Sequence, residues 1–117
     1  MQKKTPPRVV PCFDDYYMGL CFLIAARSKD PSTQHGAVIV NTNNIPLGFG
    51  YNGVPQKILD RDIDWQRPEK YPFIVHAEEN AIDHSYSDLN GAVIYVTGMP
   101  CVECTKRIIS KKIRRIV

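Results

Sequence analysis

The stretch AVIVNTNNIPLGFGY, residues 37–51, decides the fold of this 117-residue chain. Ala37–Val40 is apolar and mostly β-branched, which is typical of a strand. Asn41–Asn44 is polar and predicts a turn, and Ile45–Tyr51 returns as a second strand. The stretch therefore predicts a β-hairpin.

Helical patterns alternate with short strands on both sides of this hairpin. Before it, Phe13–Ser28 has apolar residues at helical spacing, with Asp14 as the predicted N-cap and Asp30-Pro31 as the stop. After it, we expect a long loop at 54–72, a helix at 76–86, a strand at 92–97, a helix at 101–111 and a strand that begins at 113. This order predicts the α/β class, as a three-layer α/β/α arrangement around a mixed central sheet.

Length and composition indicate a single soluble domain. The chain is 44% hydrophobic and 23% charged, the ordinary balance of a globular protein. Residues 1–12 hold three of the nine prolines, so we expect a flexible segment there and the domain at residues 13–117. The net charge of +3 is smaller than the basic footprint of most nucleic-acid-binding domains.

The N-terminal part of the chain predicts neither a membrane span nor a secretory signal. Met18–Ala26 is too short to cross a bilayer, which needs about 20 apolar residues. Met1–Arg8 is basic and proline-rich and lacks the apolar stretch of a signal peptide. We therefore expect a cytoplasmic location, where cysteines stay reduced and a CxxC pair indicates metal or redox chemistry before disulfides. The cysteines are Cys12, Cys21, Cys101 and Cys104.

Two motifs, His76-Ala77-Glu78 and Pro100-Cys101-Val102-Glu103-Cys104, carry the predicted chemistry. Each is predicted to open a helix, whose N-terminal partial charge lowers the pKa of a cysteine. One imidazole and two thiolates make three ligands, and zinc with three protein ligands is the catalytic arrangement, whereas structural zinc usually takes four. The carboxylate beside them is the expected proton carrier.

Other interpretations of these residues remain open when each motif is taken alone. A lone CxxC is also typical of redox or structural zinc sites, and a lone histidine is more often a packed or surface residue. HxE followed by PCxxC is the signature of the zinc deaminases, and structural zinc would leave Glu78 unexplained. We expect Cys21 in the core, because it falls on the apolar face of the first predicted helix, and Cys12, in the proline-rich segment, to have no role. A second metal site would have only His35 and His84 as further ligands. Whether His35 instead faces the active site is undecided.

Three further stretches make the chain resemble the deoxycytidylate (dCMP) deaminases of the cytidine deaminase superfamily. They are RSKDPSTQHGAVIV at 27–40, GYNGVP at 50–55 and KYPFIVHAEENAI at 70–82, and the resemblance covers residues from about 14 to 117. It implies zinc-dependent hydrolysis of dCMP to dUMP with release of ammonia, which feeds thymidylate nucleotide synthesis. It also implies a homo-oligomer, a hexamer or trimer of dimers.

The resemblance assigns roles by position. His76, Cys101 and Cys104 would hold one Zn²⁺, and Glu78 would shuttle the proton. The resemblance also implies the substrate contacts. The Ala77 N–H and the Pro100 carbonyl would contact the pyrimidine edge, Asn52 the sugar or base, and Lys29 and Ser32 the phosphate. For Lys29 and Ser32 an ordinary solvated loop is the alternative.

The resemblance also implies regulation and a longer chain. Effectors, dCTP as activator and dTTP as inhibitor, would bind near Gly50, Tyr51, Asn52 and Gly53, with Mg²⁺ on the triphosphate. The family normally continues for a further strand, helix and strand after the one that begins at Ile113, so we expect a chain truncated at its C-terminus. Asp60–Lys70 has no Cys or His, which argues against the extra zinc of some viral relatives.

Three alternatives to dCMP deamination share the zinc motifs. One is a dCTP or bifunctional dCMP/dCTP deaminase, and another is a deaminase of bases in tRNA or single-stranded nucleic acid. The third is a non-catalytic zinc-bearing subunit. A nucleic-acid enzyme should combine basic clusters with stacking aromatics, whereas the basic run Lys106–Arg115 is also typical of a solvated helix face. We therefore prefer a free nucleotide, and expect no membrane partner.

Overall fold

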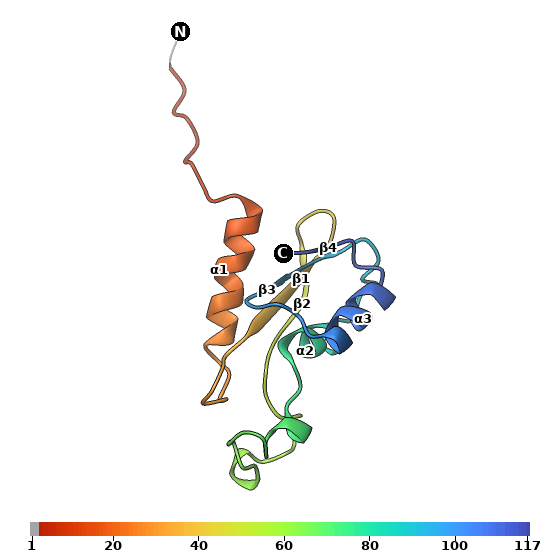
Figure 1. Ribbon diagram of the computed structural model, residues 1–117. Helices are drawn as coiled ribbons and strands as arrows, with labels where there is room; N and C mark the ends of the chain where they lie inside the picture. Colours follow the sequence, from red (N-terminus) through yellow and green to blue (C-terminus); the bar gives the residue numbers. More distant parts are fainter. Residues whose placement is uncertain (1–2) are drawn as a thin grey trace.

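The computed structural model describes residues 3–117, which fold into a sheet covered by helices on both faces (Figure 1). In chain order the elements are α1 (Phe13–Ala25), β1 (Gly36–Val40), β2 (Pro46–Tyr51), α2 (Ala77–Asp83), β3 (Val93–Val96), α3 (Val102–Ser110) and β4 (Arg115–Ile116). The strand order is β2-β1-β3-β4, with β1 antiparallel to β2 and β3, and β4 parallel to β3. The predicted hairpin and three-layer mixed sheet are confirmed.

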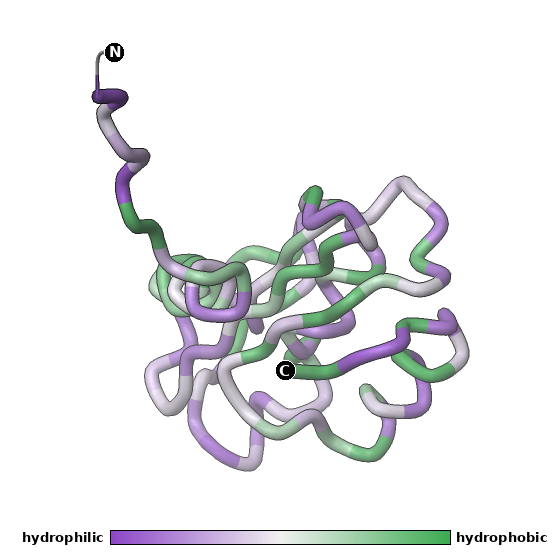
Figure 2. Tube along the Cα trace, turned by 90° about the horizontal axis from the view of Figure 1, so that it is seen from above, coloured by the Kyte–Doolittle hydropathy of each residue, from purple (hydrophilic) through white to green (hydrophobic). Residues whose placement is uncertain are grey.

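The central strand β1 is buried on both sides and divides the core in two. Because successive side chains of a strand point to opposite faces, Val38 and Val40 pack with Tyr17 and Cys21 of α1. Ala37 and Ile39 belong to the cluster on the other face, with residues of α2 and α3. Figure 2 shows the hydrophobic residues gathered along the strands. The predicted core position of Cys21 is confirmed, and burial raises the pKa of its thiol to about 11.

The ends of α1 differ from the prediction. Cys12 is the N-cap, so the prediction that Asp14 caps the helix is wrong. Asp14 lies in the first turn, where its carboxylate accepts from the Tyr95 hydroxyl (2.7 Å) and pairs with Arg115 (2.7 Å). The helix ends at Ala25 rather than Ser28, whose hydroxyl donates to the carbonyl of Asn52 (2.7 Å) and so ties the chain to the end of β2.

Both later helices begin one residue after a residue of the predicted metal site. His76 is the N-cap of α2 and Cys101 is the N-cap of α3, so both side chains stand at helix N-termini as expected. The two helices are shorter than the predicted ranges, because the chain turns after Asp83 and after Ser110. Gly50 allows α2 to lie on the sheet, since a Cβ there would come within 2.6 Å of the Ala81 nitrogen.

The predicted long loop connects β2 to α2 and contains two single 3₁₀ turns, Asp60–Asp62 and Tyr71–Phe73. Its two ends are joined by a bridge in which Gly53 and Val75 exchange backbone hydrogen bonds of 3.1 and 2.7 Å. This bridge places the start of α2 beside the end of β2.

The N-terminal residues lie apart from the sheet. Residues 3–12 have no regular secondary structure and extend away from α1 (Figure 1). Residues 1–2 of the predicted flexible segment lie outside the described residues, and flexibility of the rest stays a prediction. No helix among residues 3–117 is long and apolar enough to cross a bilayer.

Candidate active site

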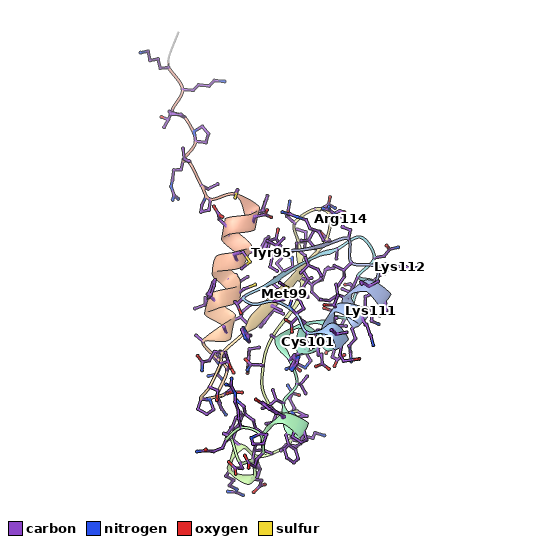
Figure 3. All side chains as sticks on the ribbon, viewed as in Figure 1. Tyr95, Met99, Cys101, Lys111, Lys112 and Arg114 are labelled. Carbon is purple, nitrogen blue, oxygen red and sulfur yellow. The ribbon has the colours of Figure 1, made fainter. Side chains whose placement is uncertain are left out.

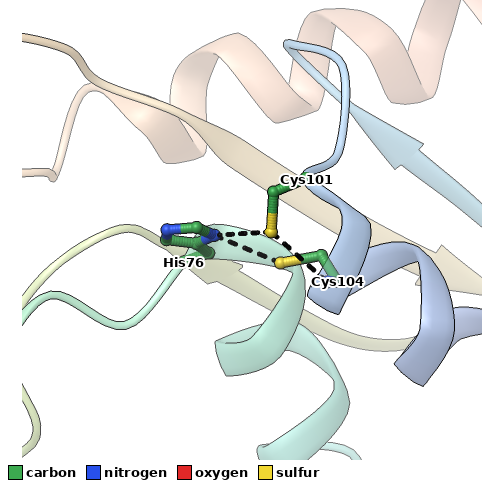
Figure 4. Close-up of side chains that lie close together, drawn as sticks. All are labelled: His76, Cys101 and Cys104. Atoms are coloured by element: carbon green, nitrogen blue, oxygen red, sulfur yellow. Dashed lines mark hydrogen bonds between the residues drawn. The ribbon is translucent and has the colours of Figure 1, made fainter.

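Three potential metal ligands meet where α2 and α3 begin (Figure 4). The Nδ1 atom of His76 lies 3.2 Å from the Cys104 sulfur and 3.5 Å from the Cys101 sulfur. All three donor atoms lie within 4.8 Å of one another. The structure therefore brings together the three residues that the two motifs predict as ligands.

This donor set fits zinc. Tetrahedral zinc with bonds of about 2.3 Å to sulfur and about 2.0 Å to nitrogen sets such donors about 3.6 Å apart. Burial raises the pKa of the Cys104 thiol well above its usual range, and the hydrogen bond with Cys101 and the charge of Glu78 act in the same direction. A cation at this position would favour the thiolate, because metal binding and thiol deprotonation are coupled.

A cavity of about 310 Å³ opens beside the three donors. That volume is in the range of small-molecule sites. One part of its lining, called here the metal wall, is formed by His76, Ala77, Glu78 and Cys101. Another part, called the loop wall, is formed by Asp30, Thr33, Arg67 and Lys70. His35 and Asn52 also line the cavity.

The metal wall holds the predicted proton carrier. Glu78 is 7% exposed, yet within residues 3–117 no group donates a hydrogen bond to its carboxylate. Ala77 is the first residue of α2, so its N–H has no carbonyl in a preceding helical turn to bond. An uncommitted acceptor and an uncommitted donor therefore belong to adjacent residues of the cavity lining.

Asn52, a predicted substrate contact, is tied to the protein itself. Its Nδ2 donates to the carbonyl of Thr33 (2.9 Å), and its Oδ1 accepts from the N–H of His35 (2.8 Å). The side chain is nearly buried, at 6% exposure. These contacts hold the backbone of residues 33–35 against the cavity.

His35, undecided from sequence, lies in the cavity lining. Its Nδ1 is 3.0 Å from the Thr97 hydroxyl oxygen, which also accepts from the N–H of Gly36 (3.2 Å). The ring lies so close to Gly98 that a Cβ there would approach the His35 Cε1 to 2.8 Å. His84 lines a different cavity.

The remaining predicted contacts do not gather here. In the described part of the chain, Lys29, Ser32 and Pro100 are not in the lining of this cavity, although Met99 and Cys101 are. The Lys29 ammonium pairs with Asp60. The predicted effector segment lines two other cavities of about 220 and 210 Å³; their lining includes Gly50, Tyr51, Asn52 and Gly53.

The loop wall contains a buried ion pair that sequence reasoning missed. Lys70 Nζ lies 2.6 Å from Asp30 Oδ1, and both side chains are 3% exposed. Burial raises the pKa of Asp30, but the Lys70 ammonium and the N–H groups of Ser32 and Thr33 outweigh it and leave the pKa below its usual value. The sequence shows Asp30 only as a helix stop, and no periodicity links it to a residue 40 positions later.

An α/β fold with a His/Cys/Cys donor set beside a cavity that also contains a free carboxylate defines a zinc-binding protein with a small-molecule site. Residues 11–117 match the family model described as cytidine and deoxycytidylate deaminase zinc-binding region. The chain belongs to this family, which confirms the resemblance noted in its sequence.

Named relatives and solved structures agree with this assignment. The chain is 46% identical over 110 residues to the deoxycytidylate deaminase of Mus musculus and 44% identical over 110 residues to that of Homo sapiens. In both cases the match covers 88% of this chain and 62% of the relative, so the chain spans under two thirds of their length. The dCMP deaminase of cyanophage S-TIM5, solved in complex with dCMP and dUMP, superimposes with a TM-score of 0.77 at 25% identity. That match covers 93% of this chain and 82% of the phage chain.

Proposed function

We propose that the protein catalyses the hydrolytic deamination of dCMP to dUMP with release of ammonia. The observation that carries the proposal is the free Glu78 carboxylate, which shares a cavity with His76 and Cys101 of the metal-donor set. The relatives named deoxycytidylate deaminases and the phage enzyme solved with dCMP and dUMP support the choice of substrate.

In this proposal His76, Cys101 and Cys104 hold one zinc ion. When bound, zinc in a site with three protein ligands supplies a water nucleophile that is activated at neutral pH. Glu78 takes a proton from the attacking water and gives it to the amine nitrogen at C4 of the pyrimidine, and the second proton of the water moves to N3. A C4–O bond forms, the C4–N bond breaks, and ammonia and dUMP result.

The backbone beside the ligands orients the base. The N–H of Ala77, which lines the cavity, donates to the pyrimidine edge. The resemblance assigns the accepting group to the carbonyl of Pro100, which lies between the lining residues Met99 and Cys101. Fixed backbone groups suit this role, because they read a base by hydrogen bonds without a side chain having to be ordered.

A nucleic-acid substrate is less well supported than a free nucleotide. Figure 3 shows Lys111 and Lys112 at the end of α3 opposite to Cys101, and Arg114 beyond that helix, just before β4. None of the three is among the residues that line the cavity in the described chain. These three residues of the basic run Lys106–Arg115 therefore lie outside the lining of the proposed active site.

Regulation, assembly and location are further parts of the proposal. A nucleoside triphosphate effector with Mg²⁺, dCTP or dTTP, would bind at Gly50–Gly53, where the second cavity also includes Lys29. A homo-oligomer, a hexamer or trimer of dimers, is proposed from the resemblance, and a cytoplasmic location from the reduced cysteines that the proposed metal site requires. The family resemblance supports the first two of these proposals.

The variant Glu78→Gln tests the proposed function. It should lower the rate of dUMP formation by about 10²- to 10⁴-fold while zinc content is unchanged, because a proton carrier is lost and the ligands are kept. Glu103→Gln, which alters an exposed carboxylate between the two cysteines, is the matched control and should keep the wild-type rate. A Glu78→Gln protein as active as the control would contradict the proposal.

A further inference from the structure

Arg67 brings to the cavity lining a positive charge that no acidic residue among residues 3–117 neutralises. Its Nη2 donates to the Thr33 hydroxyl oxygen (2.9 Å), and within residues 3–117 no carboxylate lies within ion-pair distance of the guanidinium. A guanidinium has five N–H donors in a rigid fork, so several remain for a ligand.

The two lysines near the loop wall, Lys29 and Lys70, are each paired with an aspartate. The ammonium of Lys70 is buried against Asp30 at 2.6 Å, so the two charges cancel within the wall. Lys29, the cation that the sequence suggested for a phosphate, pairs with Asp60 and lies outside the cavity lining. Among the described lining residues, Arg67 is therefore the permanent cation available to an anionic ligand.

The wall also holds Arg67 in place. The hydroxyl of Thr33 accepts from the guanidinium, and the carbonyl of Thr33 accepts from the side-chain amide of Asn52 (2.9 Å). Just before Thr33 in the chain, the N–H of Ser32 donates to the Asp30 carboxylate (2.8 Å). Arg67 is thus tied to a loop that is itself fixed by buried groups. A guanidinium positioned in this way suits a phosphate monoester, which accepts two parallel N–H···O bonds.

We propose that Arg67 is a specificity-determining residue that binds the phosphate of the nucleoside monophosphate. Thr33 acts as a positioning residue through its contact with the guanidinium. One cation matches a monophosphate, whereas a triphosphate would bring further negative charge without a second free cation among the described lining residues. This inference rests on the proposed deamination, and it places phosphate recognition on the long loop rather than on Lys29 and Ser32.

Steady-state kinetics with dCMP and deoxycytidine test the proposal. Arg67→Met should raise KM for dCMP by about 10- to 100-fold, the range for a lost hydrogen bond to a charged group, with kcat changed less than about threefold. Values for deoxycytidine, which has no phosphate, should not change. Arg67→Lys should recover part of the affinity, and Arg61→Met, which removes an exposed arginine of the same loop outside the lining, should behave as wild type.

A binding measurement separates recognition from folding. Calorimetric titration with dUMP should show a weaker Kd for Arg67→Met than for Arg61→Met, at equal melting temperatures. The role of Arg67 would be overturned if KM for dCMP were equal in the two variants. It would also be overturned if Arg67→Met raised KM for dCMP and for deoxycytidine by the same factor. A zinc-loaded wild type that deaminates neither substrate would instead refute the proposed function.

Discussion

Replacing Lys70 by Met should destabilise the protein strongly, because it leaves the Asp30 carboxylate buried without its counter-charge. Both side chains are 3% exposed and 2.6 Å apart. Removing one partner of such a pair typically costs about 3–5 kcal/mol. The stability of a domain of this size is about 5–15 kcal/mol, so the loss should be easily measured.

The chain offers a matched control for this experiment. Lys29 pairs with Asp60, but the side chains are 63% and 42% exposed. Exposed pairs contribute about 0–1 kcal/mol, so Lys29→Met should have little effect. Adding Asp30→Asn to Lys70→Met should recover part of the loss, because the amide oxygen still accepts from the N–H of Ser32 and no charge is buried.

The effect should also depend on pH. The folded-state pKa of Asp30 is lowered, so ionisation of this carboxyl stabilises the fold above the unfolded-state pKa of about 3.9. That contribution is lost as pH falls through the lower folded-state pKa. Loss of Lys70 should raise the folded-state pKa of Asp30, because its counter-charge no longer offsets the burial. The difference in stability between wild type and Lys70→Met should therefore shrink as pH falls and the carboxyl of the variant is protonated.

Urea unfolding followed by circular dichroism at pH 7 measures these differences, provided that the m-value is unchanged. We expect Lys70→Met to lose about 3–5 kcal/mol and Lys29→Met to lose under about 1 kcal/mol. Equal stabilities of the two variants would refute the reasoning, because exposure would then not decide the contribution of an ion pair here.

Two further predictions concern the cavity and the core. Gly98→Ala should raise KM for dCMP, because the new Cβ would come within 2.8 Å of His35 Cε1 and displace the ring. Gly19→Ala is the kinetic control, because a Cβ at Gly19 would have no atom within 4 Å. A wild-type KM in Gly98→Ala would contradict the packing of His35 against Gly98. Ile39→Ala should lower the free energy of unfolding by about 2–5 kcal/mol, because this side chain is fully buried in the centre of the sheet. A loss below about 1 kcal/mol in urea unfolding would argue against that burial.

Local patterns predicted those parts of the fold in which neighbouring residues decide the outcome. The hairpin follows from two apolar runs around a polar turn, and its alternation places Ile39 and Val40 on opposite faces. The cap of α1 was predicted wrongly because acidic residues are favoured both at the N-cap and in the first turn, and Asp14 occupies the first turn.

In the candidate site, too, the parts that local motifs determine were predicted and the parts that depend on distant contacts were not. His76 and Cys101 were expected to meet because each motif places a ligand at a helix start, and the structure brings them together. The loop wall was not predictable, because the contact of Arg67 with Thr33 and that of Lys70 with Asp30 join irregular segments far apart in sequence. Such contacts depend on the path of a loop that has no periodicity.

Zinc content and ammonia release, measured on the same sample of folded protein with dCMP as substrate, test the central claim most directly. The account predicts one zinc per chain, formation of dUMP and ammonia in equal amounts, loss of both after chelation, and recovery when zinc is restored. Folded protein that carries zinc at His76, Cys101 and Cys104 and yet releases no ammonia from dCMP would contradict it.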